Sequence, residues 1–199
     1  MKQLLMPAIA GALVAMSGAA LADTAVSAVA DLNVRAGPGP RYPVVGVLPA
    51  GQPAALQGCM ENSKWCTIAE ADGQGWVYSD YLTADFGAGP VVLTDRPTDS
   101  DIAIVQPPSD IGDYPDNYPA AIAPGDAVEP VEPPPQVRTY IRTHEAEPVY
   151  LEGEVVSGAV LPDSVVLQPI PDYDYSYVYV NGEPALIDPA TRRVVYVVR

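Results

Sequence analysis

The chain has 199 residues, enough for one ordinary domain or two small ones, and it carries 25 acidic against 10 basic side chains. The formal net charge of −15 argues against nucleic acid and anionic membrane surfaces as partners, because both require a basic face. The ordinary consequence of such acidity is solubility. Beyond the N-terminal segment no apolar run is long enough to span a bilayer, so we expect no integral membrane span.

The first 22 residues have the pattern of a secretory signal peptide. Lys2 gives a basic start, residues 4–16 form an apolar core too short to cross a bilayer, and residues 20–22 place small side chains before the cleavage site. Cleavage after Ala22 removes one base and no acid, which leaves 25 acids against 9 bases (9 − 25 = −16). We therefore expect a periplasmic or secreted protein.

The two cysteines, Cys59 and Cys66, are expected to form a disulfide, because the compartment is oxidising and their number is even. Segments 54–59 and 65–70 predict a hairpin that places the two thiols opposite each other. A metal site would need further ligands nearby, and the single histidine, His144, is distant in the sequence. We expect neither a metal nor a cofactor.

Composition divides the mature chain into three parts. Residues 23–84 are strand-like, with expected strands at 32–34, 44–48, 54–59, 65–70 and 75–82, the last ending in a helical turn. Short strands with turns about every 8–12 residues are typical of a small barrel. Residues 136–199 return to β-branched and aromatic alternation.

The middle part, residues 85–135, holds 11 prolines, many acids and a single base, Arg96. Such a segment buries too little apolar surface to offset the entropy of ordering, so a disordered, acidic, Pro-rich linker is expected. Docking of its prolines onto the first part is disfavoured, because Glu129 and Glu132 stand where a Pro-rich ligand carries a base.

The first part resembles the bacterial SH3 domains of extracellular proteins. The matching positions are Leu32, Asn33, Val34, Arg35, Gly37, Gly39, Gly51, Trp65, Ile68, Gly75, Trp76, Val77, Tyr81 and Leu82. The resemblance implies an SH3-like barrel with the indole of Trp76 in its core. It also implies binding of a cell-wall peptide or an envelope protein.

A candidate ligand groove on this barrel combines four side chains. Tyr42, Tyr78 and Tyr81 are rings with polar tips, which suit interfaces that are apolar at one end and wet at the other. Arg35 would orient a ligand carboxylate through paired hydrogen bonds. The alternative for Arg35 is hydrogen bonding to the carbonyls of its own loop.

The last part predicts a small antiparallel β-meander. Residues 137–144 and 149–156 alternate as strands do, and prolines at 162, 169 and 171 exclude a long helix. Asn181-Gly182 between two β-rich runs is a strong hairpin signal, and residues 194–198 add a third strand. Tyrosines at 173, 175, 177 and 179 fall on one strand face, where cross-strand packing or ligand stacking would use them.

This tail is similar to a small C-terminal domain of unknown function found in secreted proteins of Gram-negative bacteria. The residues that carry the similarity are Gly158, Leu161, Pro162, Val165, Pro169, Pro171, Tyr179, Asn181, Asp188, Pro189 and residues 193–195. The resemblance covers residues 136–199 and implies no activity.

No catalytic constellation is present. The chain has one histidine, its cysteines are expected to be oxidised, and 10 of its 25 carboxylates lie in the linker, where nothing would hold a pair at catalytic distance. Amidases and peptidases that carry SH3 modules place their catalytic site in a separate domain. The sequence therefore predicts a non-enzymatic, all-β protein with an SH3-like barrel, a disordered Pro-rich linker and a C-terminal meander.

Two functions fit this organisation. The first is an envelope adaptor whose barrel binds peptidoglycan peptide or an envelope protein. The alternative is a structural or stress-associated envelope protein that makes only protein–protein contacts through its strand edges.

Overall fold

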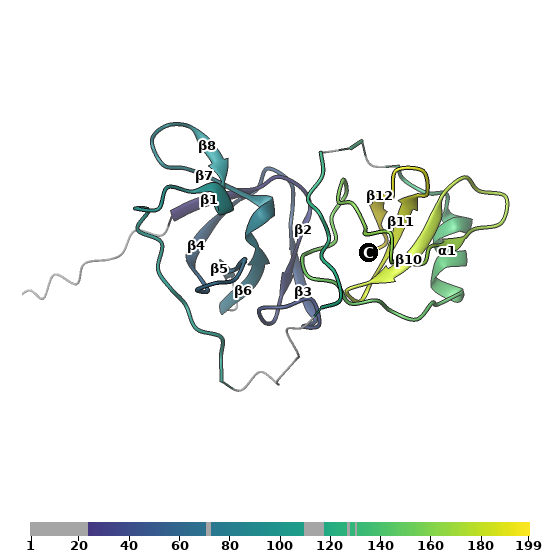
Figure 1. Cartoon of the computed structure of the whole chain (residues 1–199), viewed down its shortest axis with the longest axis horizontal. Coiled ribbons are helices and arrows are strands. Elements are labelled where there is room, and N and C mark those ends of the chain that lie inside the picture. The colour runs from purple at the N-terminus through teal and green to yellow at the C-terminus, as the bar shows by residue number, and fades with distance from the viewer. Residues whose placement is uncertain (1–23, 71–72, 110–117, 127, 130) are drawn as a thin grey trace, which may run out of the picture.

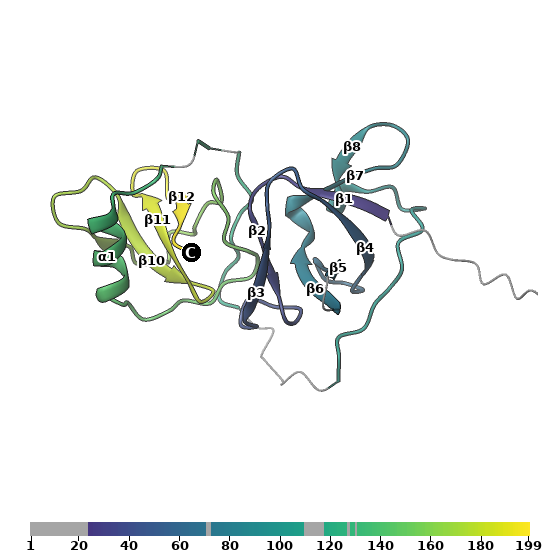
Figure 2. The same cartoon turned by 180° about the vertical axis from the view of Figure 1, so that it is seen from behind.

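The structure is a computed structural model that describes residues 24–70, 73–109, 118–126, 128–129 and 131–199. The expected signal peptide, residues 1–22, lies outside the described residues. Two sheet-based modules lie side by side in Figure 1 and, from behind, in Figure 2, and the middle of the chain runs along both. Among the described residues, none of the helices has the length and apolar character needed to cross a bilayer.

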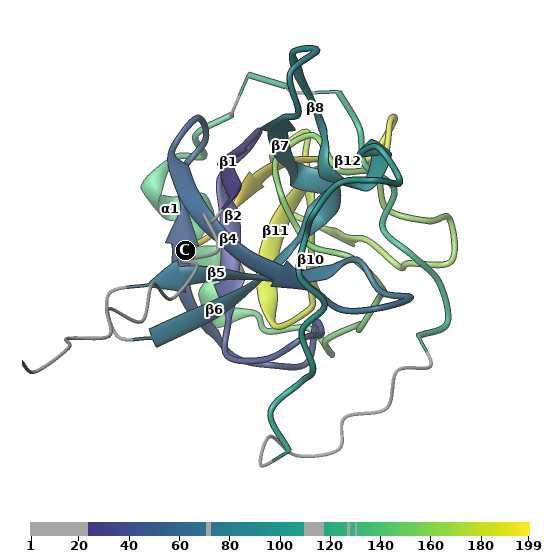
Figure 3. The ribbon, with the colours of Figure 1, turned by 90° about the vertical axis from the view of Figure 1, so that its left-hand side faces the viewer.

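The N-terminal module is an eight-stranded antiparallel sheet with the strand order β3-β2-β6-β5-β4-β1-β7-β8. Its elements are β1 (Thr24–Ala28), β2 (Leu32–Arg35), β3 (Val44–Leu48), β4 (Pro53–Cys59), β5 (Trp65–Glu70), β6 (Gly73–Tyr78), η1 (Ser79–Tyr81), β7 (Leu82–Asp85), β8 (Pro90–Val92) and η2 (Leu93–Asp95). The five expected strands are confirmed, with η1 as the helical turn, and β1, β7 and β8 add to them. The strands wrap around a common interior in Figure 3, but the ladders of the described residues do not close β8 onto β3.

The core of this module is built from side chains of these strands, and every residue of β2 and of residues 75–78 in β6 is buried. Leu32, Ile68, Trp76, Val77 and Leu82 are fully buried, which agrees with the core position that the SH3 resemblance implies for Trp76. Close approach of β2 and β6 requires glycine at position 75, since a Cβ there would lie 2.1 Å from the Val34 side chain.

Cys59 and Cys66 form the expected disulfide, which joins facing residues of β4 and β5. Both cysteines are buried, so the bond closes the base of the β4–β5 hairpin inside the module. The loop of residues 60–64 projects beyond it.

The C-terminal module is a four-stranded antiparallel sheet in the order β12-β11-β10-β9 with one helix packed against it. Its elements are α1 (Pro135–Thr143), β9 (Gln168–Pro169), β10 (Ser176–Val180), β11 (Glu183–Asp188) and β12 (Arg193–Val197). The expected hairpin and third strand are present, with φ of 55° at Asn181 and 82° at Gly182, as a tight two-residue turn requires. The hydroxyls of Tyr177 and Tyr179 donate to carbonyls of His144 and Ile141, so these rings pack against the end of α1.

Two expected strands are wrong. Residues 137–144 lie largely in α1, because Val137 and Ile141 are four positions apart and bury together against the sheet, and Pro135 begins the helix. Residues 149–156 make only isolated bridges, and Gly153 breaks the extended conformation with φ of 103°. The chain is therefore mostly β rather than all-β.

The described portions of residues 85–135 differ from the expected disordered linker. Leu93 is fully buried, the backbone at Ala103 and Val105 hydrogen-bonds to Cys59, and the backbone of Ile122 donates to Glu152. Composition indicates that this segment cannot build a core of its own. Here the two modules supply the core and the backbone partners instead.

A buried ion pair joins the two modules. Arg35 at the end of β2 and Glu154 of the C-terminal module are 1% and 0% exposed, and the Arg35 guanidinium donates to both carboxylate oxygens. Its remaining N–H groups donate to the backbone oxygens of Pro40, Tyr42 and Asn181. All five guanidinium donors are thus satisfied within the chain.

Neighbouring groups complete this interface. Asn33 Nδ2 and the Val155 backbone N–H donate to Glu154 Oε1 at 3.1 and 2.9 Å. At the chain end, Arg199 Nη2 donates to the Asp31 carbonyl and to Asn33 Oδ1 at 3.0 and 3.2 Å. The ion pair is therefore embedded in a network that holds the modules in one arrangement.

Replacement of Glu154 by glutamine is expected to lower the free energy of unfolding by about 3–5 kcal/mol, because it leaves a buried guanidinium without its counter-charge. The matched control is Glu132→Gln, which removes the exposed ion pair between Glu132 and Arg138 and should cost about 0–1 kcal/mol. Urea unfolding of the two variants measures the difference. Equal losses would contradict the importance of the buried pair.

Candidate functional site

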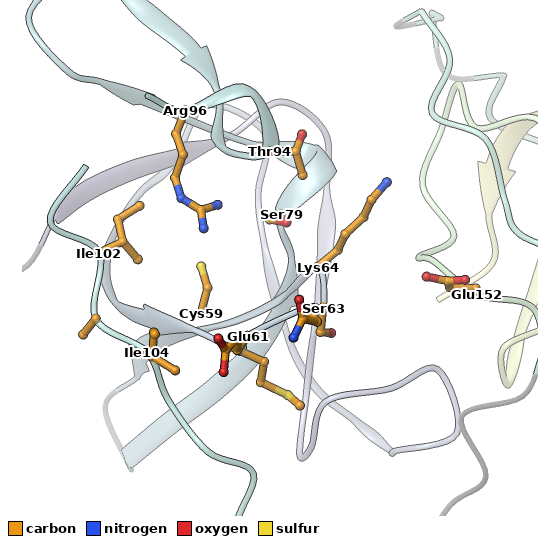
Figure 4. Close-up of a pocket in the computed structure, with 13 residues that line it drawn as sticks. Cys59, Glu61, Ser63, Lys64, Ser79, Thr94, Arg96, Ile102, Ile104 and Glu152 are labelled. Carbon is orange, nitrogen blue, oxygen red and sulfur yellow. The ribbon is translucent and has the colours of Figure 1, made fainter. Parts of the chain in front are cut away.

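A hollow of about 520 Å³ beside the tip of the β4–β5 hairpin is the candidate functional site, and we call it the hairpin hollow. Three parts of the chain line it: the N-terminal module, through the hairpin and Ser79 of η1; the middle segment; and one residue of the C-terminal module (Figure 4). The lining residues are 59–64, Ser79, Thr94, Arg96, 102–104 and Glu152. The site therefore exists only where these three parts meet.

The hairpin hollow is lined by charges of both signs. Arg96 points into it from the rim in Figure 4, and its Nη1 donates to the Leu93 carbonyl at 3.1 Å. Lys64 Nζ lies 2.8 Å from Asp80 Oδ2 and 5.8 Å from the centre of the Tyr78 ring. Glu61 and Glu152 supply carboxylates. Such a lining suits a short peptide that carries both a carboxylate and an amine.

One wall of the hairpin hollow is an extended segment of the chain itself. The Cys59 backbone N–H donates to the Ala103 carbonyl at 2.9 Å, and the Val105 N–H donates to the Cys59 carbonyl at 3.0 Å. The segment forms a parallel bridge there, because β1 pairs with β4 only up to Leu56 and leaves this part of the strand edge open. The N-terminal module thus already holds an extended peptide by backbone hydrogen bonds.

Glycine at position 58 permits this contact. A Cβ at position 58 would lie 2.6 Å from the Ala103 carbonyl oxygen and 2.6 Å from a methyl carbon of Val105. Both distances are shorter than side chains tolerate, so any larger residue would push the segment away.

Tyr78 and Tyr81, which the sequence placed in a groove, lie in the buried aromatic cluster beneath the hairpin. The Tyr78 ring centre is 5.3 Å from that of Trp65 and 6.5 Å from that of Tyr81. Burial, followed by the charge of Asp80, raises the pKa of both tyrosine hydroxyls, so both remain neutral at physiological pH. Both rings are therefore part of the interior of the module.

Arg35 and Tyr42 meet at a separate hollow of about 210 Å³ between the modules, which Asn181 and Glu183 complete. The Tyr42 ring packs on its own loop, since a Cβ at Gly37 would lie 2.5 Å from it. Arg35 makes the loop hydrogen bonds that were its alternative role, and its other donors go to the C-terminal module. A ligand carboxylate would therefore have to displace Glu154 to reach Arg35.

The structure thus brings together Arg35 with Tyr42 and Tyr78 with Tyr81, at two different places. Their role in ligand binding stays a prediction. Sequence reasoning missed Lys64, Arg96 and Glu152 as lining residues of the hairpin hollow. The projection of residues 60–64 beyond a disulfide-closed hairpin was the available signal for Lys64, whereas Arg96 and Glu152 arrive through folding of distant segments.

Within the described residues, His, Cys, Asp and Glu side chains form no group of three or more that could hold a metal ion. His144 stacks on Tyr140 at the end of α1, with ring centres 4.0 Å apart.

Comparison with known proteins identifies both modules. Residues 30–83 match the family described as bacterial SH3 domain, and residues 140–199 match the family described as domain of unknown function (DUF1236). An 84-residue stretch is 33% identical to a Bacillus subtilis (strain 168) protein named "Putative N-acetylmuramoyl-L-alanine amidase YrvJ". That alignment covers 42% of this chain but only 16% of the relative. No solved structure matches the chain.

Gly58→Ala is expected to detach residues 103–105 from β4, because the added methyl group occupies the position of the Ala103 carbonyl. Hydrogen exchange should then show faster exchange of the Cys59 and Val105 amides, whose acceptors are lost. The matched control is Gly46→Ala, which like Gly58 is a strand glycine without positive φ, and whose added Cβ would meet only the Val34 Cβ at 3.7 Å, an ordinary contact. Unchanged protection of both amides in Gly58→Ala would contradict this arrangement.

Glu183→Gln is expected to gain stability relative to the wild type as pH rises. Burial raises the pKa of the Glu183 carboxyl, against smaller opposing effects of Arg35 and Arg199. An acid whose pKa is higher in the folded than in the unfolded state, about 4.3, destabilises the fold as pH rises through the interval between the two values. Urea midpoints of both proteins between about pH 3 and 8 measure the difference. A variant less stable than the wild type at neutral pH would contradict this sign.

Proposed function

We propose that this chain is a non-enzymatic cell-envelope protein whose bacterial SH3 module binds short peptides of the cell wall in the hairpin hollow. Bacterial SH3 domains are typical of cell-wall binding, and residues 30–83 match that family. The aligned relative is named for an amidase of N-acetylmuramoyl-L-alanine, and the shared stretch is a small fraction of it. A binding module common to both proteins explains why only this short stretch of the relative aligns with the chain.

The observation that supports the proposal most is the extended segment held at Cys59. Residues 103–105 occupy this stretch of the β4 edge, so the edge accepts an extended chain through its backbone, and the side chains of the adjoining hairpin hollow would select a second peptide beside it. The lining of the hairpin hollow includes the cations of Arg96 and Lys64 and the carboxylates of Glu61 and Glu152, which together suit a peptide with charged groups of both signs. A short wall peptide offers both the backbone amides and these charges.

An extracytoplasmic location is indicated by the disulfide and by the SH3 module together. The absence of catalysis is supported by the surroundings of the usual nucleophiles. Both cysteines are oxidised, and His144 lies on the C-terminal module, where its Nδ1 is 2.9 Å from the Tyr140 carbonyl. Binding without turnover is the function that fits these groups.

Contact with an envelope protein is the second candidate, and β3 favours it. This strand is one edge of the eight-stranded sheet, and Val45 and Val47 on it are 62% and 38% exposed. Unpaired edges with apolar side chains are typical places for strand addition by a partner.

Co-sedimentation of the chain from Asp23 to Arg199 with insoluble peptidoglycan tests the first candidate. We expect binding at moderate salt, and we expect Arg96→Gln to lower the bound fraction about fivefold or more, since a hydrogen bond to a charged group contributes about 1.5–3 kcal/mol. Arg138→Gln is the matched control, because Arg138 is a partly exposed arginine of the other module. It should bind as the wild type does.

Three outcomes would overturn the proposal. Absence of sedimentation by the wild type would remove wall binding and leave the envelope-protein partner. Release of soluble wall fragments by the wild type would show an enzyme. Equal binding by the wild type and Arg96→Gln would move the site away from the hairpin hollow.

A further inference from the structure

A second hollow, of about 500 Å³, lies where the β2–β3 loop of the SH3 module meets the C-terminal module. We call it the seam hollow. Its lining combines one cation, Arg41, and one acid, Glu147, with apolar and uncharged polar side chains, most of them from the other module. The lining residues are Arg41, Pro119, 146–150, Ser164, Val166, Gln168 and Val178. It shares no lining residue with the hairpin hollow.

Arg41 differs from the other bases of the described chain. Its Nε–H is buried and has no hydrogen-bond partner among the residues that the structure describes. Each of the other described bases donates to a carboxylate or a backbone carbonyl: Arg35, Lys64, Arg96, Arg138, Arg142, Arg192, Arg193 and Arg199. In a chain with a net charge of −15, a buried guanidinium N–H without such a partner requires an explanation.

Ring stacking fixes the position of Arg41. Its guanidinium carbon lies 4.3 Å from the centre of the Tyr150 ring and 6.0 Å from that of Tyr118. Stacking of this kind holds the planar group by its face and leaves the N–H donors at its edge available. A buried donor without an acceptor is costly, so an acceptor from outside the chain would lower the free energy of the site.

We propose that the seam hollow binds the C-terminal carboxylate of a short peptide, with Arg41 as the group that recognises it. A carboxylate is planar and matches the fork of guanidinium donors. The neighbouring Val149, Val166 and Val178 suit a small apolar side chain on the terminal residue. Ser164 and Gln168 supply polar groups for the peptide backbone.

Charge makes this site selective. The acidic chain repels anions in general, so an anion binds only where a fixed cation and further contacts act together. Glu147 at the same hollow disfavours a second negative charge on the ligand. A peptide with a single terminal carboxylate and an apolar last residue fits these conditions better than a polyanion does.

This inference is independent of the proposed function, because it concerns a different hollow. Loss of wall binding in the Arg96→Gln variant would leave the seam hollow unchanged. Loss of peptide-carboxylate binding in an Arg41 variant would leave the hairpin hollow unchanged. The two proposals therefore fail separately.

The test is titration of the chain from Asp23 to Arg199 with N-acetyl-alanyl-alanine and with its C-terminal amide, followed by calorimetry or by NMR. We expect the free acid to bind about tenfold or more tightly than the amide, as expected when a charge-assisted hydrogen bond is lost. Arg41→Gln should weaken the acid to the level of the amide and should leave the amide unaffected. Arg138→Gln should bind both ligands as the wild type does.

If the glutamine variant does not fold, Arg41→Lys replaces it as the test variant, because lysine keeps the positive charge and lacks the paired N–H donors of the guanidinium. It should weaken the acid and retain part of the preference over the amide. The proposal is overturned if acid and amide bind alike, if neither binds the wild type at about 10 mM, or if the acid preference survives in Arg41→Gln. Tighter binding of inorganic phosphate than of the acid would show a general anion site and would overturn it as well.

Discussion

The buried ion pair between Arg35 and Glu154 is the contact on which the arrangement of the two modules depends. Two fully buried charges are tolerated only when each has its partner and its remaining hydrogen-bonding groups are satisfied. Arg35 meets that condition with five donors and five acceptors, drawn from its own loop, from Glu154 and from the backbone of Asn181. In either module alone, the buried charge would lack its counter-charge, which would be strongly unfavourable. The pair therefore exists only in the joined protein.

Joining the modules in this way creates surfaces that neither module has by itself. Glu152, two residues before Glu154, reaches the hairpin hollow from the C-terminal module. Tyr150, four residues before Glu154, stacks on Arg41 at the seam hollow. Because one irregular segment carries all three residues, the ion pair fixes the position of both hollows. Binding at either hollow is thus linked to the integrity of the seam between the modules.

Local sequence signals identified much of the fold. The Asn181-Gly182 turn, the Cys59–Cys66 hairpin and the SH3 strands each depend on contacts between neighbours in sequence or on a family pattern. The helix α1 was missed because its apolar residues also alternate with polar ones over a short window, whereas Pro135 was the available sign of a helix start. The short run was therefore compatible with the two-residue period of a strand as well as with the 3.6-residue period of a helix.

The candidate sites were less predictable, for a physical reason. Arg35 and Glu154 are 119 positions apart, and nothing local to either residue indicates the other. Composition likewise indicates only whether a segment can fold by itself, and residues 85–135 bury too little apolar surface to form a core of their own. In the folded chain, Leu93 packs into the core of the SH3 module, and residues 103–105 form backbone hydrogen bonds with the edge of β4. Sequence patterns report local preference, while these sites arise from what distant segments supply to each other.

The distribution of charge also depends on which groups the fold brings together. A net charge of −15 leaves each base with many possible acidic partners, and most of the described bases donate hydrogen bonds to a carboxylate or a carbonyl. Arg41 is held instead against an aromatic face, beside a hollow that is largely apolar. The buried Nε–H of this guanidinium has no acceptor among the described residues, and such a donor costs stability unless an acceptor reaches it. The position of this single guanidinium is therefore more informative about ligands than the total charge, which mainly excludes polyanionic partners.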